Sequence, residues 1–167
     1  MRAISFLVPG ALLLTASLAH AQTDLERATA RDAANNGRGA FDAGQYEKSI
    51  DSFTRAESLV HAPPHLLFLA RAQAKLGRLV AAHETYLKIT RETLKPNAPR
   101  AFRDAQAAAE LELPALDARL PYVTVTLQGA PSDGVTVQMD STSLPAAMIG
   151  IPLPADPGQH TFKASGA

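Results

Sequence analysis

A pattern of residues that recurs after 33 positions constrains the fold of this chain more than any other feature. The stretch FDAGQYEKSIDSFTRA (residues 41–56) aligns without gaps with AKLGRLVAAHETYLKI (residues 74–89). Each copy has a glycine where one helix should end, followed by small and apolar residues at helical spacing. Each copy therefore predicts two helices joined at a glycine, and the repetition predicts that the two helix pairs stack on one another.

Start and stop signals divide residues 22–120 into five expected helices. Thr23 and Glu26 form a capping box that should begin the first helix. Asn97 can cap the fifth helix, which Pro114 is expected to kink or end. The boundaries between them are expected at Gly44, at Pro63-Pro64, at Gly77 and at Lys95-Pro96-Asn97.

The repeated core resembles the tetratricopeptide repeat, a helix-pair motif with a period of about 34 residues. The family pattern G-x-Y-x-x-[AS]-x-x-x-[FY]-x-x-A is complete in the first copy, at Gly44, Tyr46, Ser49, Phe53 and Ala56. In the second copy Leu79 and Ile89 replace the first aromatic residue and the last alanine. The resemblance implies an array of helical hairpins with a concave protein-binding face. A plain helical bundle is the alternative.

The N-terminus has the composition of a secretory signal. Arg2 supplies a positive charge, an apolar run follows from Ile4 to Leu18, and Ala19-His20-Ala21 has the small-x-small pattern of a cleavage site. A proline and a glycine interrupt the run, which is short for a membrane span. We expect residues 1–21 to be a signal peptide cleaved after Ala21, and the mature protein to be periplasmic or secreted. An uncleaved anchor is the alternative.

The composition changes at Pro121. Residues 22–120 are rich in alanine, leucine and charges of both signs, whereas residues 121–167 are rich in valine, threonine, proline and glycine. Strict alternation from Tyr122 to Leu127 and from Val135 to Met139 predicts two strands, and the run from His160 to Ala164 predicts a last one. The expected fold class is α + β in separate segments, a helical hairpin array followed by a small β-sandwich.

The stretches VTVQMDSTSLP and IPLPADPGQHTFKASGA resemble the PEGA domain, a small β-sandwich of cell-envelope proteins. The shared features are a V-x-V-x-x-D strand and turn that ends at Asp140, and a P-G-x-H-x-F approach to a strand that contains His160. Prolines confine the piece from Ile151 to Pro154 to a sheet edge. The family continues past the last strand, so the sheet is expected to be incomplete and the protein to extend beyond Ala167.

No catalytic, metal or cofactor site is recognisable in the sequence. The absence of cysteine excludes disulfides and thiolate ligands, and there is no nucleophile elbow or phosphate loop. His61 and His65 have the spacing of helical metal ligands, but two prolines lie between them and no acidic residue is next to them. The 16 basic residues balance the 16 acidic residues, which gives no net attraction to nucleic acid or an anionic membrane. We expect no enzymatic activity, no cofactor and no membrane span in the mature segment.

Protein binding is the remaining candidate function. In tetratricopeptide arrays the first helix of each pair lines a concave groove. The resemblance carries this role to Arg31, Asn35, Arg38, Phe41, Leu67, Arg71 and Lys75. A cationic groove suits an acidic segment or a chain-terminal carboxylate of a protein or peptide partner. The alternative is a solvated helix face.

Together these features suggest an exported, non-catalytic adaptor or scaffold of a bacterial cell envelope. Its helical repeats would bind a protein, and its PEGA-like sandwich would act as a spacer or surface-contact module. The alternative is a regulatory or accessory ectodomain of a longer membrane-anchored enzyme or receptor, whose span would lie beyond Ala167.

Overall fold

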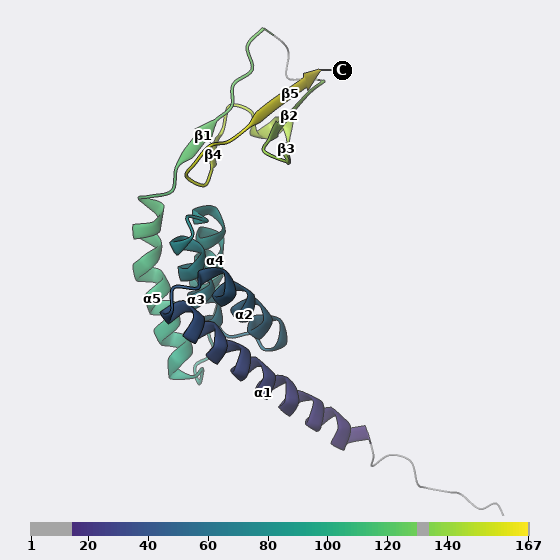
Figure 1. Cartoon of the computed structure of the whole chain (residues 1–167), viewed down its shortest axis with the longest axis vertical. Coiled ribbons are helices and arrows are strands. Elements are labelled where there is room, and N and C mark those ends of the chain that lie inside the picture. The colour runs from purple at the N-terminus through teal and green to yellow at the C-terminus, as the bar shows by residue number, and fades with distance from the viewer. Residues whose placement is uncertain (1–14, 130–133, 167) are drawn as a thin grey trace, which may run out of the picture.

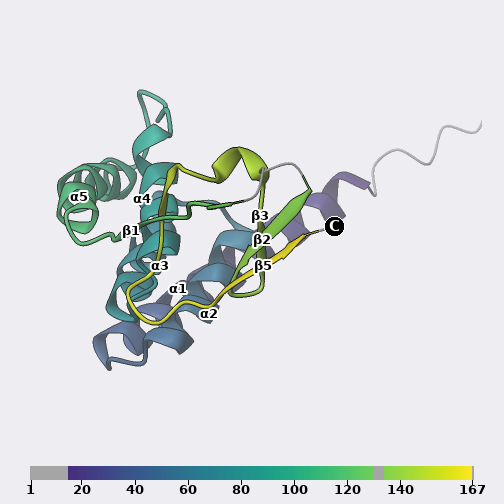
Figure 2. The same cartoon turned by 90° about the horizontal axis from the view of Figure 1, so that it is seen from above.

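The computed structural model describes residues 15–129 and 134–166, with side chains from residue 23 onward. Within these residues five α-helices come first and short antiparallel strands follow (Figure 1). The strands lie beyond one end of the helical array in Figure 1, and in the view from above they therefore overlie part of it (Figure 2). This arrangement confirms the expected order of a helical segment followed by a strand segment. Most of the expected signal peptide, residues 1–14, lies outside the described residues.

The first four helices form two hairpins. These are α1 (Thr15–Asp42) with α2 (Tyr46–Leu59), and α3 (Pro63–Lys75) with α4 (Leu79–Arg91). Pro63 and Pro64 occupy the first turn of α3, where a missing amide hydrogen costs no helical hydrogen bond. The expected boundaries at these prolines and at the two inter-helix glycines are therefore confirmed.

Both hairpins turn at a glycine with the same left-handed backbone. Gly44 has a φ of 72° and Gly77 a φ of 76°, a region that glycine adopts without the clash of a Cβ atom. The residue after each glycine donates its amide to a carbonyl five residues earlier, Gln45 to Ala40 at 2.8 Å and Arg78 to Gln73 at 3.0 Å. The 33-residue repeat is thus present in the backbone geometry of the turns as well as in the sequence.

Small residues let the two helices of each hairpin approach closely. In the first hairpin a Cβ atom on Gly37 would lie 2.8 Å from the ring of Phe53. The buried hydroxyl of Ser49 donates to the carbonyl of Gly37 at 3.0 Å. In the second hairpin Ala70 and Ala82 are fully buried. These contacts explain why glycine, serine or alanine recurs where the helices meet.

The main hydrophobic cluster lies between α3, α4 and α5 (Arg100–Asp117). Its buried members include Leu66, Leu67, Ala70, Leu79, Ala82, Tyr86, Ile89, Ala105, Ala109, Leu116 and Leu120. Helix α5 therefore covers the face of the second hairpin that the first hairpin leaves open.

Three helix boundaries differ in position from those expected. Helix α1 begins upstream, at Thr15, and runs through Thr23 without a break. Helix α5 begins at Arg100, after Pro99 rather than after a cap at Asn97. It also continues through Pro114 to Asp117. A proline in the last turn removes one helical hydrogen bond, and the burial of apolar residues after it offsets that loss.

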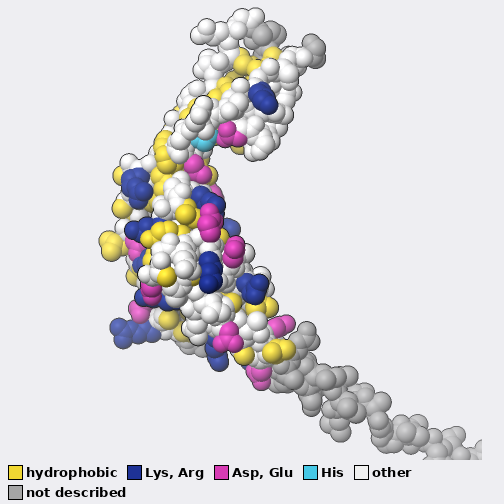
Figure 3. Space-filling view, in the orientation of Figure 1, with side chains coloured by type: hydrophobic (Ala, Val, Ile, Leu, Met, Phe, Trp, Pro, Cys, Tyr) yellow, Lys and Arg dark blue, Asp and Glu magenta, His cyan; other side chains and the backbone are white. Residues whose placement is uncertain are grey.

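The strand segment contains two small antiparallel sheets among its described residues. In one, β1 (Tyr122–Thr124) pairs with β4 (Pro152–Pro154); in the other, β2 (Val135–Met139) lies between β3 (Thr142–Leu144) and β5 (Phe162–Gly166). A 3-10 turn, η1 (Ala146–Met148), connects β3 to β4. Charged side chains are interspersed over the helical array and scarce over these strands, in line with the change in composition at Pro121 (Figure 3).

The strand predictions hold in part. Strand β1 ends at Thr124 instead of Leu127, although Val123, Val125 and Leu127 keep the expected alternation of partly buried side chains. The proline-containing piece forms β4 at the edge of its sheet, as expected. The last strand, β5, also lies at a sheet edge and extends to Gly166.

Candidate functional site

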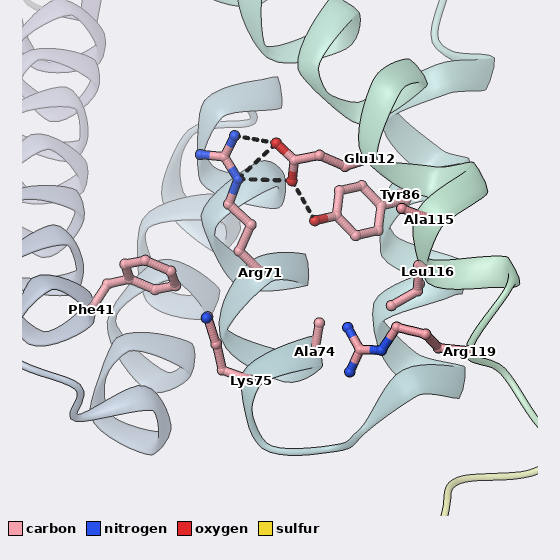
Figure 4. A pocket seen from close by; sticks show the side chains of 9 residues that line it. All are labelled: Phe41, Arg71, Ala74, Lys75, Tyr86, Glu112, Ala115, Leu116 and Arg119. Carbon is pink, nitrogen blue, oxygen red and sulfur yellow. Dashed lines mark hydrogen bonds and ion pairs between the residues drawn. The ribbon is translucent and has the colours of Figure 1, made fainter.

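A cavity of about 520 Å³ lies on the helical array between α1, α3, α4 and α5 (Figure 4). Its lining residues are Phe41, Arg71, Ala74, Lys75, Tyr86, Glu112, Ala115, Leu116 and Arg119. The lining combines three cations with one carboxylate and two aromatic rings. A wall of this kind favours anionic ligands that also carry apolar atoms.

A network of three side chains forms one side of the cavity. The guanidinium of Arg71 donates to both carboxylate oxygens of Glu112, with Nε lying 2.9 Å from Oε2 and Nη2 contacting Oε1. The hydroxyl of Tyr86 donates to the same Oε2 at 2.7 Å. The network therefore fastens α5 to both helices of the second hairpin, across 41 residues of sequence between Arg71 and Glu112.

The network keeps its members in fixed charge states at neutral pH. The hydrogen bonds from Arg71 hold the pKa of Glu112 below its usual range, and those same bonds raise the pKa of Arg71. Burial, followed by the hydrogen bond to Glu112, raises the pKa of Tyr86. Glu112 therefore neutralises the positive charge of Arg71, which leaves little of that charge to attract a ligand.

Replacing Tyr86 with Phe should lower the free energy of unfolding by about 1–1.5 kcal/mol, because a buried hydrogen bond to a charged acceptor is lost while Arg71 still satisfies Glu112. Urea denaturation followed by circular dichroism measures the change. A variant as stable as the parent would show that the hydroxyl contributes nothing to the network.

Phe68 joins the cavity to the first hairpin. Its ring stacks on Phe53 with 5.4 Å between centroids and meets the edge of Phe41 at the same separation. The guanidinium carbons of Arg38 and Arg71 lie 4.6 Å and 5.3 Å from its centroid. Cations at such distances are attracted to the face of the ring. Phe68 was not among the expected site residues, although it lies three positions before Arg71 and so shares its helix face.

The cavity contains two cations that have no ion-pair partner within the described part of the chain, Lys75 and Arg119. Both side chains are exposed. Arg119 follows α5 and was missed by the sequence analysis, because the helix was expected to be kinked or to end at Pro114. Glu112 was missed because its partners lie far away in the sequence.

The residues expected in the groove are only partly brought together. Phe41, Arg71 and Lys75 line the cavity, and Arg38 lies next to it over Phe68 while pairing with Asp42 at 2.9 Å. Arg31 and Asn35 are exposed on α1 and do not line the cavity. The surface position expected for Leu67 is wrong. Its side chain is 6% exposed because this face of α3 packs into the α3–α4–α5 cluster.

His61 and His65 lie next to carboxylates in the folded chain, although no acidic residue is adjacent to them in the sequence. His61 Nδ1 contacts Glu57, and its Nε2 lies 3.1 Å from Glu92 Oε2. The hydrogen bond to Glu57 raises the pKa of His61. His65 Nδ1 lies 3.5 Å from the other oxygen of Glu57. These contacts link the end of α2 and the α2–α3 loop to α3 and to the residue after α4, and no group of three donors suited to a metal ion occurs among the described residues.

Comparison of the chain with protein-family models, curated proteins and solved structures finds no match. Within residues 15–129 and 134–166, no helix has both the length and the apolar composition needed to cross a membrane.

Proposed function

We propose that the chain is an exported, non-catalytic adaptor of a bacterial cell envelope, and that the cavity on its helical half binds an acidic segment of a partner protein. The observation that carries the proposal is the pair of unmatched cations in the cavity lining, Lys75 at the end of α3 on the side of Phe41 and Arg119 just after α5 on the side of Leu116 (Figure 4). Cations without an internal partner can exchange water for carboxylate oxygens when a ligand arrives.

The network beside these cations favours a flexible acidic segment over a single small anion as the ligand. Arg71 is already held by Glu112, so a ligand has to find its carboxylate partners at Lys75 and Arg119 and its apolar contacts at Phe41, Ala74 and Leu116. A peptide with two acidic residues and an intervening apolar side chain meets these requirements. Such a segment would bind by electrostatic attraction and modest apolar burial, which gives a reversible, salt-sensitive complex.

The remaining parts of the proposal rest on the sequence. The resemblance to tetratricopeptide repeats supports a binding role for the helical half. The resemblance to the PEGA domain supports a spacer or surface-contact role for the strand half. The N-terminal pattern supports export with cleavage after Ala21 and a periplasmic or secreted location.

Reversing both unmatched cations in the variant Lys75→Glu/Arg119→Glu should weaken acidic peptide binding by about tenfold or more, because two attractive contacts become repulsive. Fluorescence anisotropy with a labelled Asp/Leu/Glu peptide, and with its Asn/Leu/Gln counterpart, measures the effect on the mature chain. The neutral peptide should bind weakly to both proteins, and added salt should weaken binding of the acidic one.

The variant Lys48→Glu/Lys88→Glu is the matched comparison. It makes the same change in net charge at two exposed positions outside the cavity lining. This variant should bind the acidic peptide nearly as well as the parent. Equal losses in the two variants would show that only overall charge matters, and unchanged binding in the cavity variant would refute the proposed site.

A further inference from the structure

The strand segment is attached to the helical array through Asp156, in the loop after β4. The backbone amide of Val80, in the first turn of α4, donates to Asp156 Oδ1 at 2.8 Å. The residue at the N-cap position of α4, Arg78, makes no side-chain cap and turns instead to Glu47 at 2.6 Å. Asp156 thus caps α4 from another part of the chain, and its negative charge suits the positive end of the helix dipole.

His160 holds the loop that carries Asp156. Its Nδ1 lies 2.8 Å from Asp140 Oδ2, and its Nε2 lies 2.7 Å from the backbone carbonyl oxygen of Asp156. An ionised carboxylate and a carbonyl oxygen can only accept hydrogen bonds. Both ring nitrogens must therefore donate, which requires the doubly protonated imidazolium form of His160.

Asp140 is fixed in place independently of His160. Its Oδ1 accepts the amide of Thr161 at 2.9 Å, and its own amide donates to the carbonyl of Thr161 at 2.7 Å. The Thr161 amide and, second, His160 hold the pKa of Asp140 below its usual range. The charged groups that face the ring are the carboxylates of Asp140 and Asp156, and α4 adds only the neutral amide of Val80 to this contact.

Loss of one ring proton has a defined consequence. A neutral imidazole keeps a single N–H group, and the carboxylate of Asp140 is a stronger acceptor than a carbonyl. The proton therefore stays on Nδ1, and Nε2 then presents a lone pair to the carbonyl of Asp156 at 2.7 Å. Two acceptors at that distance repel each other, which moves the loop of Asp156 away from its seated position.

We propose that His160 is a pH-dependent latch that seats Asp156 on the N-terminus of α4 when protonated and loosens the strand segment from the helical array when neutral. The hydrogen bond to Asp140 raises the pKa of His160, so the ring is protonated below its unfolded pKa of about 6.5 and stays so for some distance above it. The stabilisation from the latch is present in full below that unfolded pKa and is lost as the pH rises through the higher folded pKa.

An NMR titration of the mature chain between about pH 5 and 9 tests the latch, since this range brackets the ordinary histidine pKa. The ring signals of His160 give its midpoint, and the amide proton of Val80 reports whether it is bonded to a carboxylate. We expect the Val80 signal to move upfield as the pH rises, with the same midpoint as the His160 ring. A Val80 amide shift that stays constant while His160 titrates would overturn the proposal.

Three variants separate the latch from other effects. Asp140→Asn should shift both midpoints to lower pH together, because the ring loses its carboxylate partner. His160→Gln should abolish the transition at Val80. His83, which lies in α4 and contacts Asp117 at 3.3 Å, could also affect Val80, so His83→Gln should leave the midpoint unchanged. A transition that survives His160→Gln and disappears in His83→Gln would assign the pH dependence to α4 alone.

Discussion

Replacing Ile89 with Ala should lower the free energy of unfolding by about 2–5 kcal/mol, the range for buried isoleucine truncations that leave a cavity. Ile89 is fully buried at the end of α4 and belongs to the cluster that includes Ala105 and Ala109 of α5. Because these facing residues of α5 are already small, nothing nearby can expand to fill the space. The equivalent residue of the first hairpin is the smaller Ala56, which is also fully buried.

Urea denaturation followed by circular dichroism measures this loss. Ile89→Val, which removes a single methyl group, should cost about 0.5–1.5 kcal/mol. Leu111→Ala is the matched surface change on α5, since Leu111 is 80% exposed, and should stay within about 0.5 kcal/mol of the parent. An Ile89→Ala protein no less stable than Leu111→Ala would mean that α5 does not pack on the second hairpin in solution.

The parts of the fold that sequence analysis predicted are those determined locally. Gly44 and Gly77 end their helices because each adopts a left-handed backbone, and this requirement is visible in one residue. The prolines of β4 place it at a sheet edge for an equally local reason. The spacing between the two glycines then predicts two similar hairpins.

Helix α5 ends three residues later than an end at Pro114 would place it, because packing with distant residues outweighs the local effect of the proline. A proline disfavours helix, but Leu116 and Leu120 are buried against α3 and α4, and their burial favours continuation of α5. The cavity depends on this continuation, since Arg119 follows the end of α5. The sequence pattern contained no signal for the packing partner of the residues after Pro114.

The sequence predicted the part of the candidate site that lies on a single helix face. Arg71 and Lys75 are four residues apart on α3, so their common face could be read from the sequence. The pairing of Arg71 with Glu112 could not, because it depends on how α5 packs across α3. Because Glu112 occupies Arg71, the cations that remain available to a ligand are Lys75 and Arg119, whereas the sequence had predicted Arg71 and Lys75.

Replacing Gly37 with Ala should lower the free energy of unfolding by about 1–3 kcal/mol, the usual cost of an added carbon in a packed interior. The new Cβ atom would lie 2.8 Å from two carbons of the Phe53 ring, inside the closest normal contact. The ring cannot simply retreat, because it is 2% exposed and stacks on Phe68. The strain should therefore spread through Phe68 toward Arg71 and the cavity.

The repeat itself would suggest the opposite result. The second hairpin has Ala70 at the position of Gly37, and alanine is favoured over glycine in a helix by about 0.8–1 kcal/mol. Gly39→Ala isolates this preference, because nothing lies within 4 Å of its added carbon in the same helix. We expect Gly39→Ala to raise the denaturation midpoint and Gly37→Ala to lower it. Stabilisation by both would show that helix preference outweighs the contact with Phe53, and that α1 and α2 can separate enough to admit a methyl group.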